Sequence, residues 1–173
     1  MAKVAFLGLG VMGYPMAGHL KNKGGHEVTV YNRNAEKAAK WAAQFGGKTA
    51  ATPKEAAEGQ DFVMMCVPAT DNTKHLLGRK EIGLMQPGTG FINYSRADLV
   101  DYNALSERLK RNELTAILDV FNPEPLPSSS PLWRVPNLIM TPHCSSDDTE
   151  AYTPRTLEVV LSNIEDRKST RLN

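Results

Sequence analysis

The sequence predicts an α/β fold in which helices cover both faces of a doubly wound, mostly parallel sheet. Short apolar runs alternate with helical patterns along most of the 173 residues. These runs are nearly continuous and do not alternate with polar residues, which is typical of parallel strands buried on both faces. Right-handed connections from strand to helix to strand then give a doubly wound topology.

The expected elements follow one another in order along the chain. Strands are expected at residues 4–7, 28–31, 61–67, 90–93, 116–120 and 137–140, and helices at 12–23, 35–45 and 149–166. A further helix begins near Pro53, because Thr52 can cap it and Glu55 can reach back to the cap amide. The proline-rich loop after residue 121 has Phe121, Leu126, Leu132 and Trp133 as expected anchors.

Composition narrows the class of protein. Hydrophobic residues make up 41% of the chain and the net charge is +1, so no general attraction to nucleic acid or to an anionic membrane is expected. The apolar runs are too short to span a bilayer, and the start of the chain leaves no room for a signal peptide. Cys66 and Cys144 are too few for a disulfide framework and lack metal-ligand spacing. We expect a cytoplasmic protein with reduced thiols and no bound metal.

A glycine-rich motif, Gly8-Leu9-Gly10-Val11-Met12-Gly13, stands between the first strand and its helix. Gly8 suits the tight turn, Gly10 lets the backbone approach a pyrophosphate, and Gly13 lets helix and strand pack closely. Free amides at the helix N-terminus can then hold the phosphates. This context predicts a dinucleotide-binding (Rossmann) domain over residues 1–166, with 167–173 as a frayed tail of non-native character. A glycine-rich turn without a ligand is the alternative.

The end of the second strand indicates which dinucleotide binds. An NAD enzyme usually carries an Asp or Glu there, but this chain has Asn32, Arg33 and Asn34. A carboxylate would repel a ribose phosphate, whereas an arginine can bind it through two charge-assisted hydrogen bonds. The segment therefore favours NADP, with NAD still possible. Arg33 as an ordinary surface charge is the alternative.

Residues 3–66 resemble the β-hydroxyacid dehydrogenases, a family that includes hydroxyisobutyrate dehydrogenase and glyoxylate/succinic semialdehyde reductase. The resemblance is carried by Gly8–Ala17 and Tyr31–Asn34. Residues 67–166 instead resemble the D-isomer-specific 2-hydroxyacid dehydrogenases. Three segments carry this second resemblance, at 87–101, 118–126 and 131–143. The two resemblances together imply a chimera with a join near 61–68.

The second resemblance implies a set of catalytic residues. Arg96 would bind a substrate carboxylate and polarise the neighbouring carbonyl. His143 would be the acid and base, and Glu124, if hydrogen-bonded to it, would raise the pKa of the imidazole. These roles imply hydride transfer between NADP(H) and a small 2-keto or 2-hydroxy acid. A lone Arg, Glu or His is more often a surface residue, so only the motif match supports the three.

The same resemblance implies further contacts with the cofactor. Asp119 would hold the nicotinamide carboxamide, and Val67, Pro68 and Thr73 would line the cofactor cleft. Members of both families carry a second domain, which we expect this chain to lack, so turnover should be weak. A non-catalytic dinucleotide-binding module is one alternative, and an enzyme completed by homodimer formation is another.

Overall fold

The computed structural model describes residues 1–145 of the 173. The chain divides into two compact units, Met1–Pro142 and His143–Asn173. The first holds the whole sheet, and only three residues of the second are described. The helix expected at 149–166 and the tail expected at 167–173 lie outside the described residues. Among residues 1–145, no helix is long and apolar enough to cross a membrane.

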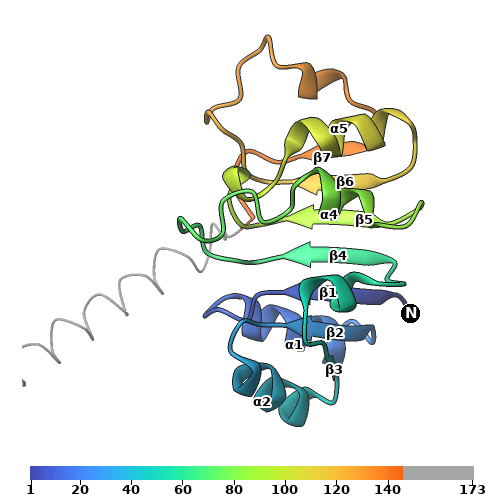
Figure 1. The fold of residues 1–173 in the computed structure, drawn as a ribbon, viewed down its shortest axis with the longest axis vertical. Helices are drawn as coiled ribbons and strands as arrows, with labels where there is room; N and C mark the ends of the chain where they lie inside the picture. Colours follow the sequence, from blue (N-terminus) through green and yellow to red (C-terminus); the bar gives the residue numbers. More distant parts are fainter. Residues whose placement is uncertain (146–173) are drawn as a thin grey trace, which may run out of the picture. The chain divides into compact units, whose positions relative to one another are not determined.

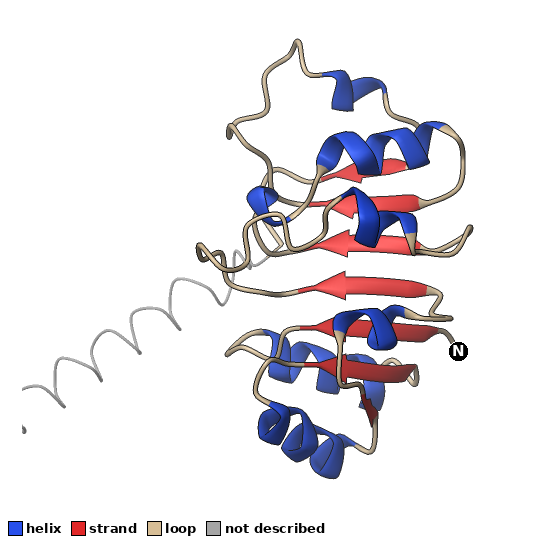
Figure 2. Ribbon diagram, viewed as in Figure 1, coloured by secondary structure: helices blue, strands red, loops and turns tan. Residues whose placement is uncertain are grey.

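One seven-stranded sheet forms the centre of the first unit, and every pair of neighbouring strands is parallel (Figures 1 and 2). The strands are β1 (Lys3–Leu7), β2 (Glu27–Tyr31), β3 (Lys48–Thr49), β4 (Phe62–Met65), β5 (Gly90–Asn93), β6 (Thr115–Leu118) and β7 (Leu138–Met140). Their order in the sheet is β3-β2-β1-β4-β5-β6-β7. The direction of winding therefore reverses between β1 and β4, which confirms the predicted doubly wound fold.

Helices fill the connections between the strands. They are α1 (Gly13–Asn22), α2 (Ala35–Phe45), α3 (Pro53–Ala57), α4 (Arg79–Gly83) and α5 (Tyr102–Lys110), with short 3₁₀ helices at Ala97–Leu99 and Pro131–Arg134. Residues of α1 and α2 share one buried cluster, whereas residues of α3, α4 and α5 share another. Helices therefore cover both faces of the sheet, as the continuous apolar strands predicted.

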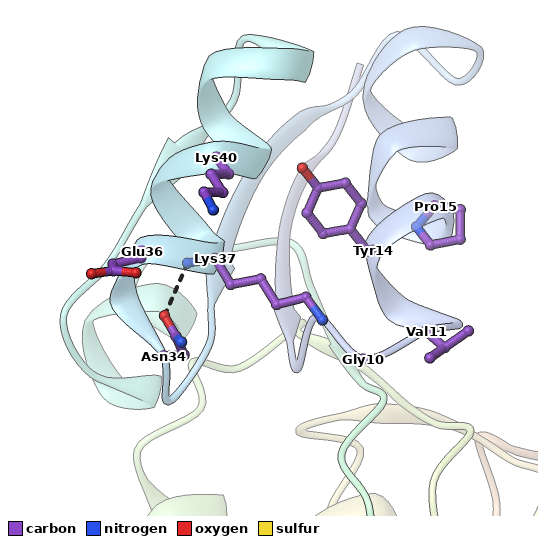
Figure 3. A pocket seen from close by; sticks show the side chains of 8 residues that line it. All are labelled: Gly10, Val11, Tyr14, Pro15, Asn34, Glu36, Lys37 and Lys40. Carbon is purple, nitrogen blue, oxygen red and sulfur yellow. Dashed lines mark hydrogen bonds between the residues drawn. The ribbon is translucent and has the colours of Figure 1, made fainter. Parts of the chain in front are cut away.

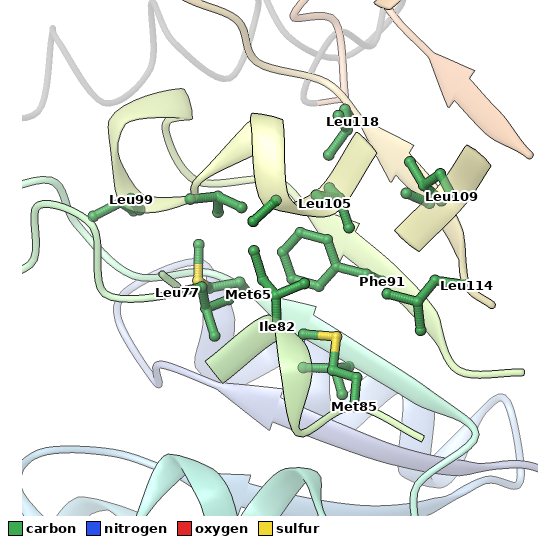
Figure 4. Close-up of a cluster of buried hydrophobic side chains, with 14 of the residues drawn as sticks. Met65, Leu77, Ile82, Met85, Phe91, Leu99, Leu105, Leu109, Leu114 and Leu118 are labelled. Carbon is green, nitrogen blue, oxygen red and sulfur yellow. The ribbon is translucent and has the colours of Figure 1, made fainter. Parts of the chain in front are cut away.

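Alternation along the central strands divides the two cores. In β1, Phe6 belongs to the cluster under α1 and α2, while Ala5 and Leu7 belong to the opposite cluster. Trp41 of α2 is fully buried in the first cluster. Phe91 of β5 lies among leucines of the second cluster (Figure 4). β1 thus contributes side chains to both cores, because successive residues point in opposite directions.

Most predicted elements appear within two residues of their expected bounds. Thr52 caps α3 by accepting a hydrogen bond from the amide of Glu55, as predicted. The Glu55 carboxylate, however, accepts from the amide of Ala51, one residue before the cap. Trp133 is no buried anchor, because the residue is 54% exposed, although its ring N–H donates to the carbonyl of Pro127. β3, α4 and α5 were not predicted from the sequence.

Candidate dinucleotide site

The predicted site residues of the first unit follow the ends of strands. Parallel strands place all their carboxyl ends at one edge of the sheet, and ligands of such folds bind outside this edge where the winding reverses. β1 ends next to Gly8, β2 next to Asn32, β4 near Val67 and β6 next to Asp119. The fold therefore brings these residues to the same edge.

The glycine turn after β1 is tightly packed at its two ends. Gly8 has a φ of +100°, and an added Cβ would lie 2.4 Å from the carbonyl oxygen of Cys66. A Cβ at Gly13 would lie 2.1 Å from the carbonyl oxygen of Gly8. The Gly8 amide donates to the carbonyl of Tyr31, which joins the turn to the end of β2. Close approach thus requires glycine at both positions, as the motif predicted.

Gly10, at the middle of the turn, faces open space. No other atom would lie within 4 Å of a Cβ placed there. The neighbouring Val11 side chain is 90% exposed. A pyrophosphate needs this kind of opening beside the first turn of a helix, where backbone amides remain available. The turn therefore leaves open space at Gly10, beside the first turn of α1.

An open groove of about 550 Å³ begins at this turn and runs between α1 and α2. It is lined by Gly10, Val11, Tyr14, Pro15, Asn34, Glu36, Lys37 and Lys40. Figure 3 shows the Lys37 side chain reaching from α2 toward Gly10, with the Tyr14 ring between the two helices. The groove thus joins the glycine turn to a pair of positive charges.

Two of the three polar residues after β2 are engaged within the protein. Asn32 accepts a hydrogen bond from the amide of Leu9 at 3.0 Å and so supports the glycine turn. Asn34 caps α2 by accepting from the amide of Lys37 at 3.1 Å. Arg33 is exposed and makes no hydrogen bond or ion pair with residues 1–145. Among these three, Arg33 has the side chain that is available to a ligand.

Lys37 and Lys40 are site candidates that the sequence analysis missed. They lie three residues apart on α2, so both fall on the helix face that borders the groove. Their spacing after the Asn32–Asn34 segment was the available signal.

The connection after β4 lines the other side of the turn. The Val67 side chain lies against Gly8, and its amide donates to the hydroxyl of Ser95 at 2.9 Å. Thr73 donates to the carbonyl of Pro68 at 2.9 Å and so closes a compact loop. Burial raises the pKa of the Cys66 thiol, so this thiol remains protonated at neutral pH. Among the described residues, no three metal-binding side chains gather.

Arg96 and Glu124 lie on two neighbouring loops, which a hydrogen bond from Asn122 to Asp98 joins. Arg96 is exposed and donates from Nη1 to the carbonyl of Ser95 at 2.7 Å. Glu124 is also exposed, and its Oε1 accepts from the amide of Phe121 at 2.7 Å. His143 begins the second unit, with a φ of 55° and an exposed side chain. Its pairing with Glu124 stays a prediction.

Asp119 is the buried carboxylate of this edge. Only 1% of the residue is exposed, and its Oδ1 accepts from the hydroxyl of Thr141 at 2.5 Å. Thr141 follows β7, so this bond joins the ends of two neighbouring strands. The Asp119 side chain thus has a fixed orientation, which a contact with a cofactor amide would require.

Residues 1–145 match the sequence profile of the D-isomer specific 2-hydroxyacid dehydrogenase, NAD binding domain. The matched range crosses residues 61–68, where a join was expected. The comparisons support neither a separate β-hydroxyacid dehydrogenase origin for residues 3–66 nor a chimera. The prediction of two separate families was therefore wrong, because one profile covers residues 1–145.

Individual relatives agree with the profile. An uncharacterized oxidoreductase of Shewanella frigidimarina is 48% identical over 122 residues, which are 70% of this chain and 39% of that protein. Glyoxylate/hydroxypyruvate reductase B of Enterobacter sp. is 44% identical over 87 residues, or 50% of this chain and 27% of that protein. A solved D-isomer specific 2-hydroxyacid dehydrogenase of Xanthobacter autotrophicus superposes with a TM-score of 0.75 at 31% identity, over 85% of this chain and 48% of that one. The chain spans less than half of each relative's length.

Proposed function

Because this chain belongs to the family of D-isomer specific 2-hydroxyacid dehydrogenases, as its NAD binding domain, we propose that it binds a nicotinamide dinucleotide for hydride transfer to or from a small 2-keto or 2-hydroxy acid. The glycine turn at the reversal of winding carries the proposal. Its open middle at Gly10 leaves room for a pyrophosphate beside the first turn of α1. The named relatives add the substrate class, since one is a glyoxylate/hydroxypyruvate reductase.

The predicted site residues have complementary roles in this proposal. When bound, the dinucleotide would supply or accept the hydride. Arg96 binds the substrate carboxylate through its planar guanidinium and withdraws electron density from the adjacent carbonyl. His143 gives a proton to the carbonyl oxygen during reduction and takes it back during oxidation. Glu124 stabilises the protonated imidazole, and Asp119 accepts a hydrogen bond from the nicotinamide carboxamide. Val67, Pro68 and Thr73 border the cofactor.

We further propose that the cofactor is NADP in preference to NAD. Arg33 stands at the end of β2, where the ribose of a bound dinucleotide lies in this fold. The groove beside it contains Lys37 and Lys40, which add positive charge toward a ribose phosphate. Glu36, the carboxylate among the lining residues, is on α2 and not at the strand end. A phosphate would thus meet cations at the position where an NAD enzyme has a carboxylate.

Calorimetric titration of the chain with NADP and with NAD tests both proposals. The parent is expected to bind NADP more tightly, and Arg33→Ala to weaken NADP about tenfold while leaving NAD within about twofold, because only the phosphate contact is lost. Arg134→Ala, which removes an exposed arginine from the connection between β6 and β7, is the matched control. Equal affinities of the parent for NADP and NAD, or an NADP affinity that Arg33→Ala leaves unchanged, would contradict the preference for NADP. Absence of binding by either cofactor would remove the proposal itself.

A non-catalytic dinucleotide-binding module is a second candidate, because the profile that the chain matches is that of an NAD binding domain. Oxidation of NADPH with glyoxylate separates the two functions. An enzyme, including one completed by a homodimer, consumes NADPH and loses this activity in Arg96→Ala and His143→Ala. A module shows the same background rate in the parent and in both variants.

A further inference from the structure

A chain of hydrogen bonds begins at Asn93, the last residue of β5, whose side chain is fully buried. Asn93 Oδ1 accepts from the amide of Ser95 at 2.9 Å, and Asn93 Nδ2 donates to the carbonyl of Arg96 at 3.2 Å. One side chain thus holds the backbone immediately before Arg96 and the carbonyl of Arg96 itself. The backbone from which the guanidinium projects is fixed to the core of the sheet.

The same amide nitrogen extends the connection to α5. Asn93 Nδ2 also donates to the hydroxyl of Tyr102 at 3.1 Å, and that hydroxyl donates to the carbonyl of Val120 at 2.7 Å. Val120 is fully buried after β6 and begins the loop that leads to Glu124. The phenol therefore bridges the loop after β5 and the loop after β6.

Two further contacts join the same loops. Asn122 donates to the carboxylate of Asp98 at 2.7 Å. The ring of Tyr102 packs edge-on against Phe121, with centroids 6.4 Å apart, and the Phe121 amide is the one that donates to Glu124. Tyr102 thus contacts the Glu124 loop through its ring and through its hydroxyl.

Burial keeps the phenol in its donor form. It raises the pKa of Tyr102 above the ordinary value, and the negative charge of Glu124 adds to the rise, whereas the hydrogen bond from Asn93 opposes it. The hydroxyl therefore remains protonated through the physiological range. A buried network in which every member is paired is stiffer than its separate bonds.

We propose that Asn93 and Tyr102 are positioning residues for Arg96, which they hold at a fixed place beside the Glu124 loop. The inference rests on the proposed function, because it assigns Arg96 to a substrate carboxylate. An exposed arginine on a loop needs a fixed backbone if its guanidinium is to meet a carboxylate in one orientation. Asn93 and Tyr102 themselves need not touch the substrate.

Tyr102→Phe is the variant that tests this role. It retains the ring and its contact with Phe121, so the core is preserved, while the bridge to Asn93 and Val120 is lost. Ser106→Ala is the matched control, because the Ser106 hydroxyl donates to the carbonyl of Tyr102 on the same helix without reaching either loop. Both variants lose one hydroxyl from α5, and only one of them breaks the bridge.

Two NMR measurements on ¹⁵N-labelled chain serve as readouts. Backbone relaxation reports the order of residues 95–97 and 120–121. The Arg96 Nε–H signal reports the binding of oxamate, a small 2-keto acid analogue, which is titrated in the presence of saturating NADPH. In Tyr102→Phe we expect lower order in both loops and an oxamate affinity weaker by about tenfold, the size of one lost hydrogen bond. NADPH affinity should stay within about twofold, and Ser106→Ala should match the parent throughout.

The outcomes separate the two proposals. Unchanged loop order in Tyr102→Phe, or an oxamate affinity equal to that of the parent, overturns the positioning role. An equal effect in Ser106→Ala also overturns it, because general weakening of α5 would then be the cause. If oxamate leaves the Arg96 Nε–H signal of the parent unchanged although NADPH binds, the assignment of Arg96 to the substrate fails. The positioning role then fails as well, even if the order of the loops changes in Tyr102→Phe. The positioning role is supported if the Arg96 signal of the parent shifts with oxamate and if only Tyr102→Phe loses oxamate affinity and loop order.

Discussion

At the scale of single residues, the glycines of the turn differ in what surrounds them. A Cβ at Gly13 would lie 2.1 Å from a backbone oxygen, whereas one at Gly10 would meet nothing within 4 Å. Packing within the protein therefore requires glycine at position 13. No neighbouring atom requires it at position 10, where a ligand can fill the open space.

We predict opposite defects for alanine at these two positions. Gly13→Ala should lower the free energy of unfolding by about 1–3 kcal/mol, because α1 must move away from the turn. Gly10→Ala should unfold like the parent in urea but bind NADPH at least about tenfold more weakly, because its methyl group occupies the pyrophosphate space. Urea denaturation and calorimetry measure the two effects. Parent-like NADPH binding by Gly10→Ala would contradict the placement of the phosphates.

Tyr102 makes stability depend on pH in alkaline solution. Its pKa is raised above 10.0 in the folded chain, mainly by burial, so the folded state holds this proton more tightly than the unfolded state. The stabilisation is complete below pH 10.0 and declines as the pH rises further, with a slope of up to about 1.4 kcal/mol per pH unit. We predict that the parent loses more unfolding free energy than Tyr102→Phe between about pH 9 and 11. Parallel pH profiles in urea denaturation would refute this.

The predictable residues were those constrained by backbone chemistry or by a family motif. Glycine spacing identified the turn, because few other residues tolerate such close approach. Lys37 and Tyr102 were missed for a physical reason. Each acts through a long side chain that reaches from a helix to a different segment, and local spacing does not encode that reach.

At the scale of elements, Arg108 joins the end of α4 to α5. This buried guanidinium donates to the carbonyls of Ile82 and Met85, at 2.7 and 3.0 Å, and to the carboxylate of Glu113 at 2.5 Å. A buried arginine is favourable only when all its hydrogen bonds are made. This side chain therefore joins the two helices from the buried side, in addition to the exposed pair of Arg79 and Glu107.

We predict that Arg108→Met destabilises the chain by about 2–4 kcal/mol, because two buried carbonyls and a carboxylate lose their donor. Arg111→Met is the control, since Arg111 is exposed and also contacts Glu113. Its urea midpoint should stay close to that of the parent. Equal midpoints for the two variants would show that Arg108 does not hold α4 and α5 together.

The missed elements have weak local signals. β3 has two residues, both exposed, so no apolar run marks it. α5 did leave a signal, because Asp101 caps it and Leu105 and Leu109 are buried four residues apart. The long apolar strands were predictable because burial on both faces leaves a strong pattern, whereas short helices on one face leave only part of one.

At the scale of the whole first unit, parallel topology explains why residues far apart in sequence form one candidate site. Every strand end points to the same edge, so Gly8, Arg33, Arg96 and Asp119 gather there although they span over a hundred residues. The sequence predicted these residues from the glycine motif, the segment after the second strand and the family resemblance, without the order of the strands. It could not provide the groove between α1 and α2, which arises only when the two helices pack on the sheet.

The central claim is that a dinucleotide phosphate lies against the backbone amides of the glycine turn. Titration of ¹⁵N-labelled chain with NADPH, followed by amide chemical shifts, tests it most directly. We predict saturable shifts at Gly10, Val11 and Gly13. The signals of Gly46 and Gly59, which lie at the ends of α2 and α3, should stay nearly unchanged. Unchanged signals at the turn under excess NADPH, or larger shifts at the reference glycines, would contradict it.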